Sequence, residues 1–95
     1  MSYVLIEHTV GDFETFKAVY LDDGPRRARL GSKGGRVFRS SGDPNSVFIV
    51  LEWDDVAGAR EFADSLELHE AMQWSTSNVG MPRIEVLEHS FDSDS

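Results

Sequence analysis

His8 is the residue of this chain best suited to acid–base chemistry. It lies in the apolar run Tyr3 to Val10, and an imidazole in a cleft can accept a proton because it titrates near neutral pH. Glu7 precedes it, but adjacent residues on a strand point to opposite faces and form no ready pair. We predict His8 as a candidate general base, and the alternative is a hydrogen-bonded structural histidine.

Three aromatic residues could shape a pocket for an apolar or aromatic ligand. They are Trp53, Phe62 and Trp74, and large flat side chains provide contact area and stacking. Trp53 continues an alternating apolar face, so core packing is its other expected role. Trp74 lies late in a helical pattern beside a Ser/Thr/Asn/Gly-rich loop, and such loops often border ligand sites.

Glu52 interrupts one face of the most apolar run of the chain, Val47 to Asp54. A half-buried carboxylate can act as a base if its surroundings raise its pKa. The alternative is an ion pair with Arg36 or Arg39, which lie on the preceding strand-like segment.

The sequence predicts no metal site and no cofactor. Histidine and glutamate do not recur at the spacing that places two ligands on one helix face, and the Glu-His pairs near both ends are adjacent residues whose side chains point apart. His69 is expected to be solvated, and a haem ligand at His8 or His69 is a minor alternative. The glycines from Gly31 to Gly35 precede a strand, so they lack the helix terminus of a phosphate loop.

Composition narrows the class of protein. With 9 basic and 17 acidic residues the net charge is -8, which argues against nucleic acid as a partner. Without cysteine there is no disulfide, thiolate zinc site or cysteine nucleophile. No apolar run approaches the roughly 20 residues of a membrane helix, and a cytoplasmic protein is expected because the chain opens in a strand-like segment. Spread acidity with few lysines suggests a halophilic proteome, the alternative being an ordinary acidic protein.

Hydrophobic periodicity predicts the order strand, helix, strand, strand, helix, strand. Strands are expected over residues 3–10, 35–40, 47–54 and 84–91, and helices over 12–22 and from Asp54 or Asp55 onward. A short helical segment from Pro25 to Leu30, closed by Gly31, is expected to lead into a turn over Ser32 to Gly35. This order predicts an α+β, ferredoxin-like fold with a four-stranded antiparallel sheet. We expect a single domain over residues 3–91 and a disordered tail over 92–95.

The run Val47 to Asp54 predicts how the protein assembles. Its side chains are mainly apolar on both faces, whereas a sheet with one solvated face would alternate with polar residues. The two helices of this fold cover one face only. We therefore expect a symmetric homodimer through the other sheet face.

The chain resembles the dimeric α/β barrel superfamily, which includes the antibiotic biosynthesis monooxygenase (ABM) domains. The resemblance covers about residues 3 to 90, and the segments that carry it are Gly31 to Ser40, Asp43 to Asn45, Leu51 to Asp55 leading into Ala59 to Ala63, and Leu66 to Met72. It implies two sheets packed face to face across a dimer axis. It also implies a pocket between each sheet and its own helices.

The activity that the resemblance implies is less defined than the fold, because fold membership does not assign chemistry. Some members of the superfamily oxidise polyketide-type aromatics without a cofactor, some degrade haem, and others isomerise or cyclise. The resemblance implies a homodimer that binds a small apolar or aromatic molecule, with His8 as the general base if there is catalysis. The competing hypothesis is a non-catalytic dimeric binding or stress-related module.

Overall fold

The structure is a computed structural model that describes residues 1–65 and 82–95. Its elements are β1 (Ser2–Thr9), α1 (Phe13–Asp22), α2 (Gly24–Leu30), β2 (Ser32–Arg39), β3 (Ser46–Trp53), α3 (Val56–Ala63) and β4 (Arg83–Glu88). The strands form one antiparallel sheet in the order β2-β3-β1-β4. The predicted α+β, ferredoxin-like fold is confirmed.

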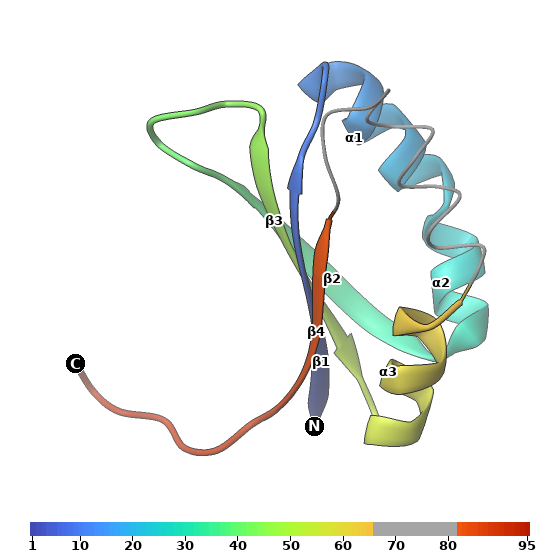
Figure 1. Cartoon of the computed structure of the whole chain (residues 1–95). Helices are drawn as coiled ribbons and strands as arrows, with labels where there is room; N and C mark the ends of the chain where they lie inside the picture. The colour runs from blue at the N-terminus through green and yellow to red at the C-terminus, as the bar shows by residue number, and fades with distance from the viewer. Residues whose placement is uncertain (66–81) are drawn as a thin grey trace.

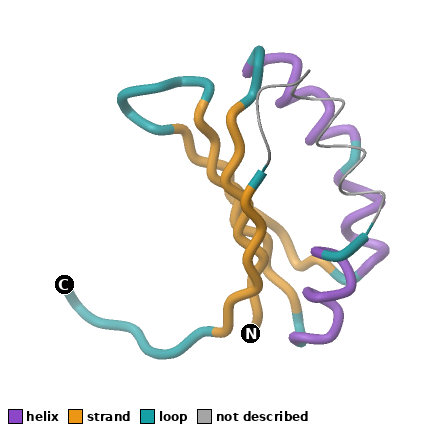
Figure 2. Tube along the Cα trace, viewed as in Figure 1, coloured by secondary structure: helices purple, strands orange, loops and turns teal. Residues whose placement is uncertain are grey.

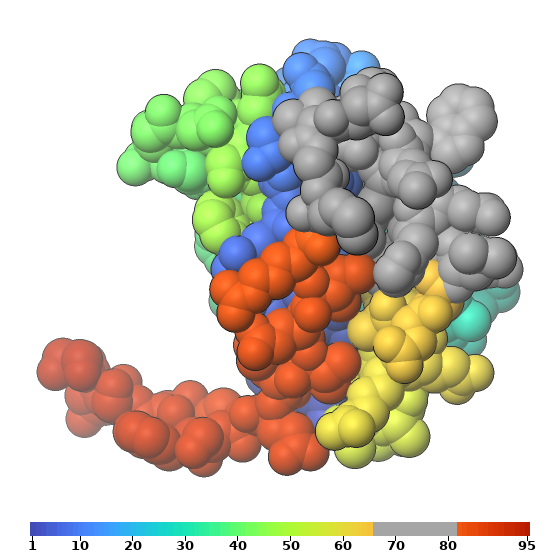
Figure 3. Space-filling model, viewed as in Figure 1, coloured from blue at the N-terminus to red at the C-terminus, as the bar shows by residue number. Residues whose placement is uncertain are grey.

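The sheet has two different faces. Figure 1 shows α1, α2 and α3 together on one side of the sheet, and Figure 2 shows the same two layers coloured by secondary structure. The C-terminal segment that follows β4 runs out on the side away from these helices (Figures 1 and 3). We call the side away from the helices the open face. From the alternation and the register of the strands, it carries Tyr3, Leu5, Glu7, Arg36, Phe38, Phe48, Val50, Glu52, Arg83, Glu85 and Leu87.

Two aspartates begin the helices. The carboxylate of Asp12 accepts a hydrogen bond from the Thr15 backbone N–H at 3.1 Å, and that of Asp55 accepts one from the Gly58 N–H at 2.7 Å. Each carboxylate satisfies one of the amides that have no partner at a helix start. Gly31 ends α2 in the left-handed region at φ 116°, which glycine adopts without steric cost. The predicted helix start at Asp12 and the predicted stop at Gly31 are confirmed, and of the two candidate starts Asp54 and Asp55 the structure uses Asp55.

Arg27 fixes the junction between α1 and α2. Its Nη2 donates to the Tyr20 carbonyl oxygen at 2.8 Å, its Cζ lies 3.8 Å from the centre of the Tyr20 ring, and its Nη1 lies 3.6 Å from the Asp23 carboxylate. The side chain is largely buried. A buried guanidinium is tolerated because it has a hydrogen bond, an aromatic face and a counter-charge.

The strand ends differ from the prediction at two places. The turn predicted over Ser32 to Gly35 is wrong: β2 begins at Ser32 and continues through an irregularity between Ser32 and Gly34, where Gly34 has φ 133°. β4 ends at Glu88, three residues before the predicted Phe91, because Glu88 pairs with Ser2, the first residue of β1. Beyond it, the His89 N–H donates to the Met1 carbonyl at 3.3 Å.

The core lies between the sheet and the helices. Alternate residues of β1 and β3 point into it, and the helices contribute Phe16 from α1 and a cluster from α3. Figure 3 shows α3 lying against β4 on the surface above this core. The buried apolar residues are Val4, Ile6, Val10, Phe16, Val47, Ile49, Leu51, Trp53, Ala59, Phe62 and Ala63. The helix-covered face of the sheet is therefore mainly apolar, and the buried polar residues described on it are Ser2 and His8 at the two ends of β1.

Candidate functional site

His8 lies on the helix-covered face of β1, opposite Val47 in the register with β3. Its exposed fraction is 5%, and neither ring nitrogen has a hydrogen-bond partner among the described residues. Burial lowers the pKa of His8 below its ordinary value of 6.5, because the charged imidazolium loses its hydration. At neutral pH the ring is therefore a neutral base with an available lone pair.

We expect His8 to make the folded state less stable in acid. The unfolded chain takes up a proton near pH 6.5, whereas the pKa of His8 in the folded protein is lowered by burial. The unfolded chain therefore binds more protons below that pH, and the free energy of unfolding falls as the pH falls, by at most about 1.4 kcal/mol per pH unit from this group. Urea unfolding at pH 7.5 and 5.5 should show a larger loss for the wild type than for His8→Gln.

The matched control for this measurement is His89→Gln. His89 is an exposed histidine beyond the end of β4, so this variant removes an imidazole without changing the packed face that holds His8, and its loss should match that of the wild type. Equal losses in the wild type and in His8→Gln would show that His8 titrates as it does in the unfolded chain.

Trp53 and Phe62 lie together in the core, at the other end of the sheet from His8. Their ring centres are 5.0 Å apart with an interplanar angle of 40°, and both side chains are buried. Trp53 pairs with Ser2 in the register between β3 and β1, whereas His8 pairs with Val47. The structure therefore brings Trp53 and Phe62 into contact and leaves His8 apart from them. Trp74 and His69 lie outside the described residues.

Glu52 lies on the open face, half-buried, and not on the face of His8 and Trp53. Within the described part of the chain it has no ion pair with either predicted partner. Arg39 lies on the helix-covered face, where its Cζ stands 4.0 Å from the centre of the Phe13 ring. Arg36 shares the open face with Glu52 but is opposite Val50 in the register, while Glu52 is opposite Gly34.

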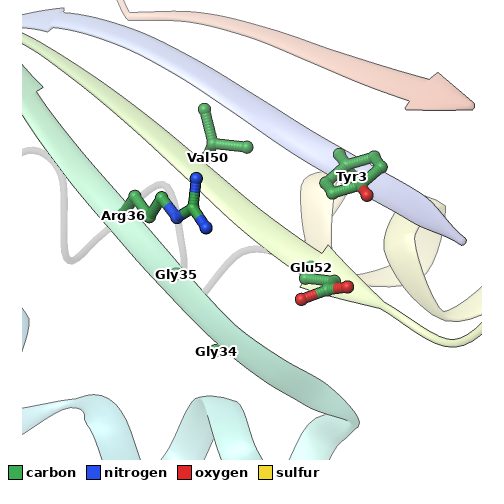
Figure 4. Close-up of a pocket in the computed structure, with 6 residues that line it drawn as sticks. All are labelled: Tyr3, Gly34, Gly35, Arg36, Val50 and Glu52. Atoms are coloured by element: carbon green, nitrogen blue, oxygen red, sulfur yellow. The ribbon is translucent and has the colours of Figure 1, made fainter. Parts of the chain in front are cut away.

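A pocket of about 240 Å³ opens beside Glu52 on the open face. Figure 4 shows its lining: Tyr3 from β1, Val50 and Glu52 from β3, and Gly34, Gly35 and Arg36 from β2. Gly34 is opposite Glu52 and places no side chain over this end of β2, where an added Cβ would have no described atom within 4 Å. Gly35 is opposite Leu51, so a side chain there would point to the helix-covered face, where a Cβ would lie 2.6 Å from Leu51 Cδ2 and 2.8 Å from the Tyr20 hydroxyl.

Sequence reasoning missed most of this pocket. The expected pocket lay between the sheet and its helices, whereas this one lies on the opposite face. The signal that could have found it is Gly34 on the strand beside Glu52, because glycine in a strand interior leaves an unfilled place on the sheet surface.

Among residues 1–65 and 82–95, no three His, Cys, Asp or Glu side chains are grouped so that they could hold a metal ion. No helix of the described segments is long and apolar enough to span a membrane.

Comparisons with known proteins identify the fold. No protein-family model and no curated protein matches the chain. Solved structures do match. SnoaB, a cofactor-independent oxygenase from Streptomyces nogalater, shares 14% identity at a TM-score of 0.74, with 99% of this chain and 96% of that chain covered. A protein from Bordetella bronchiseptica named as a candidate antibiotic biosynthesis monooxygenase shares 18% identity at a TM-score of 0.72, with 95% and 98% covered.

A conserved protein from Methanosarcina mazei has the same fold, at 13% identity and a TM-score of 0.72, with 94% of this chain and 92% of that chain covered. The matches span nearly the whole of each chain, and their low sequence identity makes them evidence about the fold. The chain therefore has the fold of the ABM structures, as its resemblance implied.

Proposed function

We propose that the protein is a homodimeric, cofactor-independent enzyme that oxidises a small phenolic or otherwise aromatic molecule on the helix-covered side of the sheet, with His8 as the general base. The fold supports this proposal, because SnoaB, described as a cofactor-independent oxygenase, shares it. The observation that carries it is the state of His8, buried and without a hydrogen-bond partner among the described residues.

An imidazole in this state is suited to a ligand that donates a hydrogen bond. Leaving a buried polar atom unpaired costs about 1–3 kcal/mol, and a phenolic O–H at a ring nitrogen of His8 would remove that cost. Transfer of the phenolic proton to the neutral imidazole gives an electron-rich phenolate. For an anthrone in its phenolic tautomer, the anion gives one electron to dioxygen, and recombination of the two radicals forms a carbon–oxygen bond as a peroxide. The imidazolium returns its proton to this peroxide, and loss of water leaves the quinone, so that anthrone and O2 give quinone and water with no group besides the protein and the two substrates.

Not all of the predicted pocket residues belong to the proposed site. Trp53 and Phe62 belong to the apolar layer between sheet and helices that would receive an aromatic ring. Glu52 has no role at this site because it lies on the opposite face of the sheet.

The test is an oxygen-uptake assay with a hydroxylated anthrone as substrate and no added metal or flavin. We expect uptake well above the protein-free rate, and the same rate after dialysis against a chelator. Stabilisation of the fold by a hydroxyanthraquinone without oxygen uptake would instead support the non-catalytic binding module, which the close packing of Trp53 on Phe62 favours. If the protein shows no oxygen uptake and is not stabilised by the hydroxyanthraquinone, the proposal is overturned.

The assay is run at low and at high potassium chloride. We propose that the protein works in the cytoplasm of a salt-adapted cell, which its net charge of -8 and its small number of lysines support. At high salt the repulsion between its acidic groups is screened, so the activity should be kept or increased. Loss of activity at high salt would contradict this setting without affecting the assignment of His8.

A further inference from the structure

The open face carries apolar side chains that no described helix covers. Phe38 is 51% exposed and Leu87 is 37% exposed, and Leu5, Phe48 and Val50 between them are half-buried. Contiguous apolar surface on a sheet face indicates an interaction site. The charged residues on the same face show what kind of partner fits it.

Most of the charges on the open face are already paired within the chain. Arg83 lies 3.6 Å from the Glu7 carboxylate and 3.1 Å from that of Glu85. Arg36 and Glu52 differ, because neither has an ion pair or a hydrogen bond to any side chain in the described part of the chain. The open face therefore presents one cation and one anion that have no counter-charge there.

The pocket separates these two charges. Arg36 and Glu52 are both part of its lining, and the register sets them diagonally, with Arg36 opposite Val50 and Glu52 opposite Gly34. Figure 4 shows the guanidinium beside Val50 and the carboxylate on the side of Tyr3, not turned toward each other. Glu52 is half-buried, so a counter-charge brought against it would be partly shielded from water.

In a dimer with a twofold axis, the cation of one copy can meet the anion of the other. In a symmetric dimer, residue i of one copy meets residue j of the other, and j meets i. We propose that, in the homodimer of the proposed function, Arg36 of each copy pairs with Glu52 of the other inside the pocket. The proposal rests on the homodimer of the proposed function and names the contact that holds it.

Other occupants fit less well. The net charge of -8 disfavours a nucleic acid. A small zwitterion could pair with both groups, but it would leave Phe38 and Leu87 exposed. A second copy covers the apolar surface and pairs both charges twice.

The test reverses one charge at a time and then mixes the variants. In Arg36→Glu each copy has two acidic groups at this contact, and in Glu52→Arg each copy has two basic groups. Both homodimers bring like charges together, so we expect the dissociation constant of each to rise at least about tenfold, as measured by sedimentation at low salt. An equimolar mixture should recover the dimer, because the acidic copy then meets the basic copy at both contacts.

The mixture decides between pairing across the axis and other roles. If Arg36 and Glu52 acted within one chain, or bound a small zwitterion, each variant would keep its like charges and mixing would restore nothing. A mixture that stays monomeric therefore overturns the proposal. So do single variants that dimerise as tightly as the wild type. Arg29→Glu, a charge reversal at an exposed position of α2 on the helix side, should leave the dissociation constant unchanged.

The oxygen-uptake assay distinguishes a failure of this contact from a failure of the proposed activity. Recovery of the dimer on mixing, with no uptake by the wild type, would retain the contact and remove the enzyme. Uptake by the wild type, together with unchanged dimerisation of both variants, would retain the enzyme and remove the contact. Circular dichroism of each variant checks that a monomeric result comes from a folded chain.

Discussion

Replacing His8 by alanine is expected to lower the rate of oxygen uptake by about 10²–10⁴-fold, the usual contribution of a positioned general base. The imidazole is buried and neutral, and its nitrogens have no partner among the described residues, so its lone pair is available to the substrate. The variant loses the base and leaves a space of about one ring. Added imidazole should therefore restore part of the activity to His8→Ala.

The matched control is His89→Ala, which removes an exposed histidine near the end of the chain. It should keep the wild-type rate. His8→Gln retains much of the side-chain volume without a titratable group and should be as slow as His8→Ala. If either His8 variant kept the wild-type rate, the acceptor of the substrate proton would have to be a different group.

Replacing Trp53 by alanine is expected to lower the free energy of unfolding by about 3–5 kcal/mol. The indole is 1% exposed, and its ring centre lies 5.0 Å from that of Phe62. A Cβ on Gly31 would stand only 3.5 Å from Trp53 Cζ3, so α2 ends directly against the indole. The cavity would thus open where β3, α2 and α3 meet.

A loss of this size is a large part of the total stability of about 5–15 kcal/mol that is usual for a domain. Urea unfolding followed by circular dichroism measures it, and Phe91→Ala is the control because Phe91 is 79% exposed. Its cost should stay within about 0.5 kcal/mol. A similarly small cost for Trp53→Ala would mean that the neighbouring elements close over the space.

The strand faces and helix starts could be predicted from the sequence because neighbouring residues determine them. Alternation correctly placed Val47 and Trp53 on one face of β3 and Glu52 on the other. Aspartates before amphipathic segments correctly gave the starts of α1 and α3, because an N-cap acts on amides only three residues away. The end of β4 was missed because it depends on where β1 begins. Glu88 is opposite Ser2, the first residue of β1, so the residues after Glu88 have no partner strand in the described sheet.

The site could be predicted less well, because its geometry depends on register. Adjacent strands suggested an ion pair between Glu52 and Arg36, but the register places Arg36 opposite Val50 and Glu52 opposite Gly34, which sets the two side chains diagonally. The pocket on the open face lies where Gly34, opposite Glu52, has no side chain. The burial of His8 could be expected from its strand, whereas the absence of a hydrogen-bond partner among the described residues required the packed structure.

The strand order also determines the sequence of events during synthesis on the ribosome. β1 is made first, yet it lies inside the sheet between β3 and β4. Once Ser46–Trp53 has emerged, β1, β2 and β3 can pair, and one edge of β1 then stays unpaired until Arg83–Glu88 follows. Such an edge is a template for pairing with another nascent chain. The last strand to be translated therefore protects the first.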